Sequence, residues 1–168
     1  MKQSSLTRYT YLAGIIDGEG CIRINKTNKN KPYYISQITV NQKDGRLIDW
    51  LYGNFGGSIN EIGGNESKTK QYRWTIYGTK VKDILKKIIP FLTIKKHQAE
   101  ILLRYQIHKE IEEKKYRNSD GTWKNISENE IKLRESLYQQ LSYLKKKYYL
   151  SRALVTTKRI NGSSEPKQ

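Results

Sequence analysis

Two carboxylates, Asp17 and Glu19, end a segment that is otherwise apolar or small. The stretch from Tyr9 to Asp17 has the apolar spacing of a short helix. The C-terminal end of a helix carries partial negative charge, so two acidic side chains there are unfavourable unless a cation binds. Carboxylate oxygens are ligands for hard cations. The spacing therefore indicates a metal site at the end of this helix.

Two glycines in the same segment predict a close helix neighbour. Gly14 and Gly18 lie four residues apart, hence on one helix face. Glycine costs up to about 1 kcal/mol against alanine inside a helix, and small residues allow two helix backbones to approach closely. Two such helices side by side would bring their carboxylates together. The plainer alternative is a buried helix that ends in a glycine turn, with both carboxylates solvated.

The composition favours a nucleic acid as partner. The 168 residues suit one compact domain or two small halves, and 32 Lys and Arg against 16 Asp and Glu give a net charge of +16. A charge of this size attracts polyanions, and Tyr, Trp and Gln are interleaved with the basic residues. Alternatives are a ribosome-associated protein or a merely soluble basic domain. The single cysteine, Cys21, excludes an intramolecular disulfide.

The apolar patterns predict an α+β fold with an antiparallel sheet. We expect a domain over residues 1–150, with additional C-terminal helices, and a basic, flexible tail over 151–168. The helix Asp44–Phe55 should bury Leu47, Ile48, Leu51 and Tyr52. No apolar signal region or membrane-spanning stretch occurs, so we expect an intracellular protein without membrane contact. The expected strands are Cys21–Lys26, Tyr34–Asn41, Ser58–Ile62 and Gln71–Tyr77, and the other helices are Thr79–Ile89, Lys96–Lys115 and Ser127–Tyr149.

One set of alternating strand positions is polar and should face a ligand. In the major groove of DNA, Arg is bidentate to guanine, and Asn or Gln is bidentate to adenine. An ordinary solvent-facing sheet would show the same alternation, but the net charge favours DNA. The predicted DNA-binding residues are Arg23, Asn25, Ile35, Gln37, Thr39, Ser58, Asn60, Arg73, Thr75 and Tyr77.

The segment Leu12–Gly20, read as LAGIIDGEG, resembles the signature motif of the LAGLIDADG homing endonucleases. Its departures are mild: Ile15 replaces Leu, Gly18 replaces Ala and Glu19 replaces Asp. The order of predicted elements is similar to the family's αββαββα core, so the resemblance covers roughly residues 6–110. The motif occurs once, and this resembles the single-motif subfamily, which acts as a homodimer.

The resemblance implies roles for individual residues. Glu19 and the carbonyl of Gly18 would bind Mg²⁺, with Mn²⁺ as a plausible substitute. Gln42 would position solvent, Arg46 would join that network, and Lys95 would place a cation beside the cleaved phosphate, with Lys96 as the alternative register. The implied dimer interface consists of Leu12, Ala13, Gly14, Ile16 and Asp17.

The function that the resemblance implies is cleavage of double-stranded DNA by metal-dependent phosphodiester hydrolysis. The enzyme would be encoded by an intron and would cut a long pseudo-palindromic site as a homodimer. Two alternatives use the same scaffold. One is an RNA maturase that binds its host intron RNA and assists splicing, and the other is a DNA-binding regulator that does not cleave.

Overall fold

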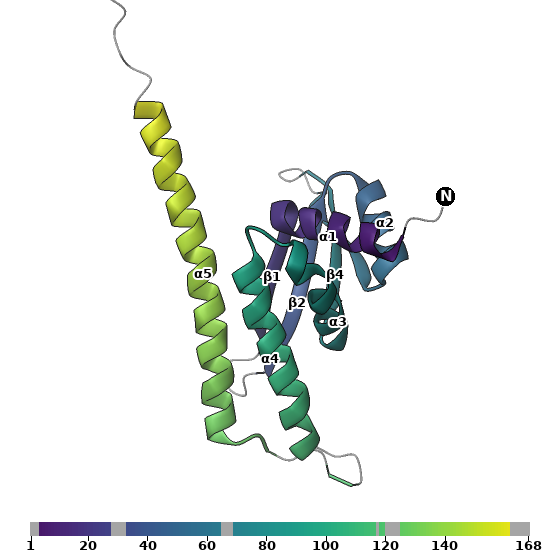
Figure 1. Ribbon diagram of the computed structural model, residues 1–168, viewed down its shortest axis with the longest axis vertical. Coiled ribbons are helices and arrows are strands. Elements are labelled where there is room, and N and C mark those ends of the chain that lie inside the picture. The colour runs from purple at the N-terminus through teal and green to yellow at the C-terminus, as the bar shows by residue number, and fades with distance from the viewer. Residues whose placement is uncertain (1–3, 28–32, 65–68, 117, 120–124, 162–168) are drawn as a thin grey trace, which may run out of the picture.

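The computed structural model describes residues 4–27, 33–64, 69–116, 118–119 and 125–161, with the side chains of the last helix described to residue 147. The strands Ser58–Ile62 and Gln71–Tyr77 and the helix Lys96–Lys115 have the predicted bounds. The order of elements confirms the predicted α+β fold (Figure 1). The elements are α1 (Ser5–Glu19), β1 (Gly20–Thr27), β2 (Tyr33–Gln42), α2 (Gly45–Phe55), β3 (Ser58–Ile62), β4 (Gln71–Tyr77), α3 (Thr79–Ile88), the 3₁₀ helix η1 (Ile89–Phe91), α4 (Lys96–Lys115) and α5 (Glu128–Asn161).

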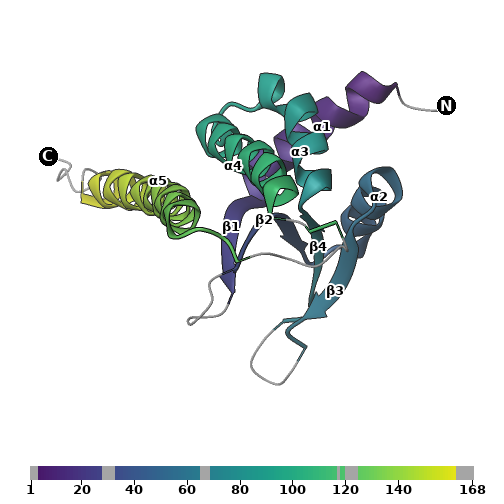
Figure 2. The same cartoon turned by 90° about the horizontal axis from the view of Figure 1, so that it is seen from below.

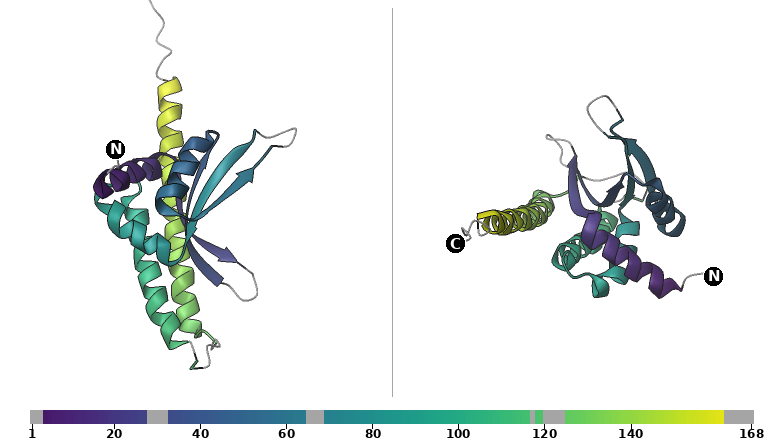
Figure 3. Two further views of the ribbon diagram at one scale, coloured as in Figure 1. Left: turned by 90° about the vertical axis from the view of Figure 1, so that its right-hand side faces the viewer. Right: turned by 90° about the horizontal axis from the view of Figure 1, so that it is seen from above.

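The four strands form one antiparallel sheet in the order β1-β2-β4-β3. Ile22, Ile38 and Ile76 are paired neighbours in one row and are fully buried. We call the face that carries this row the inner face. Helices α1 to α4 lie on it, whereas no described helix covers the opposite, outer face (Figures 2 and 3). The inner face therefore forms the core, and the outer face is open.

α1 begins at its N-cap Ser4, whose side chain accepts a hydrogen bond from the Thr7 amide at 3.2 Å. The helix ends at Gly20, where β1 starts. A Cβ atom at Gly20 would lie 2.7 Å from the backbone of Ile16, so only glycine fits there. This tight junction fixes the direction in which β1 leaves the motif helix, and hence the place of the two acidic residues.

α2 differs from its predicted packing at one residue. Ile48 and Leu51 are fully buried against the inner face, and Leu47 is partly buried. Tyr52, predicted to lie in the core, is 51% exposed. The prediction for Tyr52 is wrong because the buried stripe of α2 centres on Leu51, and Tyr52 lies on its solvent side.

α5 is longer than predicted and passes the expected domain boundary at residue 150. Its 34 residues contain no Gly or Pro, and Gly162 follows its last residue, Asn161. The helix stands beside β1, at the edge of the sheet (Figures 1 and 2). No helix in the described part of the chain is long and apolar enough to cross a bilayer.

Candidate functional site

The two motif carboxylates have separate roles in the structure. Asp17 accepts hydrogen bonds from the backbone amides of Thr93 at 2.7 Å, Ile94 at 3.2 Å and Lys95 at 2.9 Å. These amides form the N-terminal end of α4, where a negative charge is favourable. Asp17 therefore joins the end of α1 to the start of α4. Asp17 was predicted to lie in the dimer interface. Both of its carboxylate oxygens instead accept hydrogen bonds within its own chain.

Lys95 makes the reverse connection. Its Nζ donates to the carbonyl oxygens of Ile16 at 2.8 Å and Asp17 at 2.9 Å, with Gly18 farther away at 3.4 Å. The ammonium thus caps the negative end of α1. The structure distinguishes Lys95 from its neighbour Lys96, which is exposed. Of the two lysines, Lys95 is the one that lies at the motif.

The environment of Lys95 perturbs its ammonium group. Burial lowers the pKa of Lys95 below its ordinary value, and the nearby Lys145 lowers it further. The charges of Asp17, Cys21 and Glu19 act in the opposite direction. A partly desolvated cation interacts more strongly with an approaching anion than a fully hydrated one does. Such a group is suited to stabilise charge on a phosphate.

Glu19 contrasts with Asp17 because its carboxylate has no hydrogen bond or ion pair with any described residue. It is exposed at the end of α1. No group of three or more His, Cys, Asp or Glu side chains in the described residues is arranged to hold a metal ion. One carboxylate and one backbone carbonyl per chain, Glu19 and Gly18, fit Mg²⁺, which usually keeps several waters and few protein ligands.

The other two predicted catalytic residues, Gln42 and Arg46, make contacts with residues other than Glu19. Gln42 is the last residue of β2, half-buried, and pairs with Tyr72 of β4. The Nε atom of Arg46 donates to both carboxylate oxygens of Asp44 at 3.0 Å. The hydrogen bonds from Arg46 lower the pKa of Asp44 to about 2. No described hydrogen bond or ion pair joins Gln42 or Arg46 to Glu19, although Gln42 lies two residues beyond Val40, the strand partner of Gly20 at the end of the motif.

Lys145 of α5 is a residue near this site that the sequence analysis missed. Its Nζ donates to the sulfur of Cys21 at 3.2 Å, and Cys21 lies two residues after Glu19. The run of three lysines at 145–147 was a signal of basic character. The sequence could not tell which of them turns toward β1, because that depends on how α5 packs.

The strand register places all ten predicted DNA-binding residues on the outer face. Paired residues in adjacent antiparallel strands share a face. Three of the ten are buried: Gln37 and Thr39 at 4% exposure and Thr75 at 1%. Their prediction as direct readers needs correction, because neighbouring side chains on the same face cover them. The rows are Cys21–Thr39–Thr75–Ser58, Arg23–Gln37–Tyr77, Asn25–Ile35 and Asn41–Arg73–Asn60.

The predicted dimer interface also needs correction. Leu12, Ala13 and Ile16 are fully buried in the core of their own chain. They lie on the inner side of α1, which the rest of the same chain covers. Gly14 and Gly18 are exposed, and a Cβ atom added at either would meet no other atom within 4 Å. The glycine face is thus the part of the motif helix that is open to a partner.

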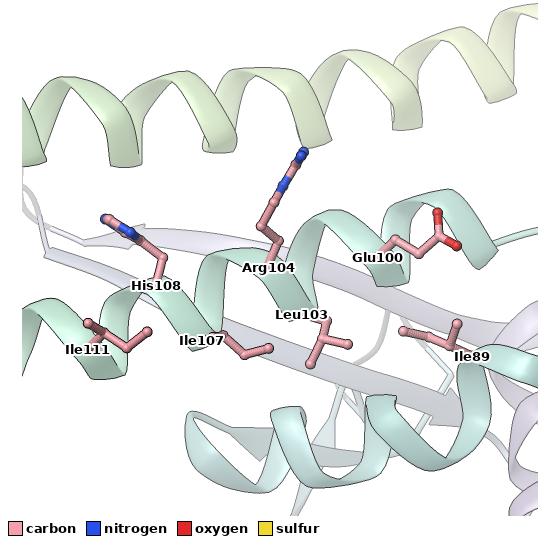
Figure 4. Close-up of a pocket in the computed structure, with 7 residues that line it drawn as sticks. All are labelled: Ile89, Glu100, Leu103, Arg104, Ile107, His108 and Ile111. Carbon is pink, nitrogen blue, oxygen red and sulfur yellow. The ribbon is translucent and has the colours of Figure 1, made fainter.

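A groove of about 510 Å³ lies along α4, away from the motif residues. Figure 4 shows Leu103, Ile107 and Ile111 on its apolar side, with Glu100, Arg104 and His108 on the same helix. Ile89 of η1 also lines the groove. None of the predicted site residues lines this groove, so it is separate from the candidate active site.

The family model of the LAGLIDADG endonucleases matches residues 12–111. This match covers more than half of the chain, which therefore belongs to the LAGLIDADG endonuclease family. The predicted family is confirmed. No curated protein matches the chain.

Solved structures of homing endonucleases share the fold. I-CvuI, in complex with its target, is 18% identical with a TM-score of 0.64, over 83% of this chain and 82% of that chain. The archaeal intron-encoded I-Vdi141I, complexed with DNA, is 17% identical with a TM-score of 0.66, over 84% and 86%. I-TnaI is 16% identical with a TM-score of 0.58, over 88% and 99%. At these identities the likeness establishes the fold.

Proposed function

We propose that the protein is a homodimeric, Mg²⁺-dependent endonuclease that cuts both strands of a long, pseudo-palindromic DNA site. The observation that carries the proposal is the difference between the two motif carboxylates. Asp17 accepts hydrogen bonds from three backbone amides at the start of α4, whereas the Glu19 carboxylate bonds to no described residue. It stands at the end of α1, beside the partly buried Lys95. A free carboxylate beside a cation and an open sheet face is suited to hydrolysis of a phosphodiester.

Each residue of the site has a role in this proposal. Glu19 and the carbonyl of Gly18 would hold Mg²⁺. When bound, Mg²⁺ neutralises charge on the phosphate and favours ionisation of water. Lys95, fixed by the carbonyls at the end of α1, would stabilise negative charge at the scissile phosphate. Gln42 would orient water through its amide group. Arg46, which Asp44 holds at the start of α2, would join this solvent network.

The homodimer is supported by the two exposed glycines of α1. Each costs up to about 1 kcal/mol against alanine in a helix, and the fold of the chain itself does not require either, since both face open space. Gly20, by comparison, is needed for the junction with β1. Packing of two α1 helices through Gly14 and Gly18 explains their presence. It would also place two copies of Glu19 near the two-fold axis, one for each DNA strand.

The cleavage test uses a randomised library of duplex DNA with Mg²⁺, followed by sequencing of the cut ends. We expect one long site with two-fold related halves. Glu19→Gln should lower the cleavage rate by about 100-fold or more while binding to the recovered site is retained. Glu100→Gln, which changes an exposed carboxylate of α4, is the matched control and should cleave normally.

Three outcomes would contradict the proposal. Undiminished cleavage by Glu19→Gln would exclude Glu19 as the metal ligand. Specific DNA binding by the unmodified protein without any cleavage would indicate a DNA-binding regulator. Selective binding of a structured intron RNA, without a DNA site, would indicate the maturase.

The dimer test is sedimentation of the unmodified protein and of Gly14→Leu. We expect a dimer that Gly14→Leu weakens, because the leucine side chain would separate the two helices. Gly53→Leu in α2 is the matched control: Gly53 is also exposed and helical, and a Cβ atom there also meets no other atom within 4 Å. A monomer with and without DNA would rule out the two-fold arrangement.

A further inference from the structure

Two arginines on the outer face are each bound to a neutral amide on the neighbouring strand. Arg23 Nε donates to Gln37 Oε1 at 2.6 Å, and Arg73 Nε donates to Asn41 Oδ1 at 2.9 Å. The partners are directly paired in the strand register. The same contact thus occurs twice, between β1 and β2 and between β2 and β4.

An amide holds a guanidinium without neutralising it. Elsewhere in the chain, Arg46 is bound to Asp44 and Arg134 to Glu130, and in those pairs a carboxylate offsets the charge. Arg23 and Arg73 have no ion pair with any described residue. Their positive charges therefore remain available to an anionic ligand, although their side chains are held in place.

The contact also leaves one edge of each guanidinium open. The amide oxygen takes the Nε hydrogen, and no acceptor among the described residues bonds to the terminal nitrogens of Arg23 or Arg73. Those two nitrogens form the end of the guanidinium fork. In this orientation an arginine donates two parallel hydrogen bonds to O6 and N7 of guanine.

The burial of the amides separates their role from that of the arginines. Gln37 is 4% exposed, so its side chain cannot reach a base, and Asn41 is half-buried. Resting on the proposed function, we infer that Gln37 and Asn41 are positioning residues that set Arg23 and Arg73 as guanine readers. Arginine side chains that are already held in the binding orientation lose less conformational entropy when they bind a base.

The positions of the two pairs predict the spacing of the bases. Gln37 and Asn41 lie four residues apart on β2, a distance of about 13 Å along an extended strand. That length corresponds to about four base pairs of duplex. If β2 follows the groove, each half-site should contain two guanine preferences about four base pairs apart. The Asn41–Arg73 pair lies nearer to Gln42, so its guanine should lie nearer to the cleavage point.

The test is a base-by-base binding profile of the full-length protein on its selected DNA site, at several salt concentrations. Gln37→Leu should reduce discrimination for guanine at one position by roughly 5- to 150-fold, with little change at other positions. Asn41→Leu should have the same effect at the second position. Arg23→Lys keeps the charge and loses the fork, so it should reproduce the Gln37→Leu profile without disturbing a buried residue.

A second variant at the same position distinguishes positioning from packing. Gln37→Glu keeps an oxygen acceptor for Arg23 but offsets its positive charge. It should therefore weaken binding to all sequences, an effect that is not expected for Gln37→Leu. Asn54→Leu is the matched control, because Asn54 accepts from Arg8 at 3.4 Å in an arginine–amide pair away from the sheet. Its profile should match that of the unmodified protein.

The outcomes separate this inference from the proposed function. If the unmodified protein has no specific DNA site, the proposed function fails. If it has one, an unchanged profile for both Gln37→Leu and Arg23→Lys overturns the inference alone. A profile without any guanine preference in either half-site would also overturn it.

Discussion

The inner and outer faces of the sheet are made by the same strands, but different neighbours bury their side chains. On the inner face, Ile22 and Ile38 are buried by one another and by the helices. On the outer face, Gln37, Thr39 and Thr75 are buried to a similar degree although no described helix covers them. Gln37, for example, is held by Arg23 of the neighbouring strand, which donates to its side chain. Inner burial stabilises the fold, whereas outer burial holds polar side chains in place on the open face.

The largest expected effect is on the inner face. Trp74 is fully buried, and its Nε1 donates to the Gly56 carbonyl at 2.6 Å. Trp74→Ala should lower the free energy of unfolding by about 3–5 kcal/mol, measured by urea denaturation. Tyr77→Ala, on the same strand but the outer face, should change it by no more than about 0.5 kcal/mol. Equal losses for the two variants would remove the distinction between the faces.

Alternation along the strands was enough to assign the faces. All ten predicted outer residues lie on one face, because a period of two residues follows directly from strand geometry. Exposure was not predictable in the same way. Gln37 and Thr75 are buried by residues that lie beside them only in the folded sheet, and the sequence does not give that register.

The motif helix shows the same limit. The sequence identified its glycine face and its acidic end, but it also assigned Leu12 and Ile16 to the dimer interface, and both lie in the core. One face of α1 packs on its own chain and the other is open to a partner. An apolar residue is compatible with either face, so its type alone does not assign it. Similarly, Lys95 is distinguished from Lys96 by its contact with the end of α1, which a pattern of residue types does not contain.

The second prediction concerns the carboxylate that joins α1 to α4. Asp17→Asn should lower the free energy of unfolding by about 1–3 kcal/mol, because three backbone amides lose a charged acceptor. Glu19→Gln should leave it nearly unchanged, since Glu19 bonds to no described residue. Urea denaturation of both variants measures the difference. A larger loss for Glu19→Gln would reverse the structural and functional roles of the two residues.

A third prediction separates specific from general contacts on DNA. Arg73→Ala should cost about 1–3 kcal/mol of discrimination at one base pair. Lys146→Ala should weaken binding to all sequences and lower the salt slope by about one. Lys146 is exposed on α5, and Lys147→Ala provides a second test of the same kind. The measurement is the binding profile at several salt concentrations. A uniform loss for Arg73→Ala would mean that the outer face does not read bases.

The smallest expected effect concerns α5, which is joined to the sheet edge partly by charge. Glu135 accepts from Lys26 at 2.7 Å and also from Tyr34. These bonds, together with one from Gln139, lower the pKa of Glu135 from about 4.5 to about 2. Because the folded state binds this proton less tightly than the unfolded chain, the contribution of Glu135 to stability is complete above about pH 4.5. It is lost as the pH falls toward about 2.

Glu135→Gln should therefore lower Tm at pH 6 and remove part of the difference in Tm between pH 6 and pH 3. Both side chains of the pair are about one third exposed, at 34% for Lys26 and 31% for Glu135, and solvent weakens such pairs. We expect a shift in Tm of no more than about 4 °C. Glu61→Gln breaks the more exposed pair with Lys70 and is the control, with a smaller shift. If both variants behave alike, the ion pair at Glu135 does not hold α5, and the apolar contact of Leu141, which is 1% exposed, must do so instead.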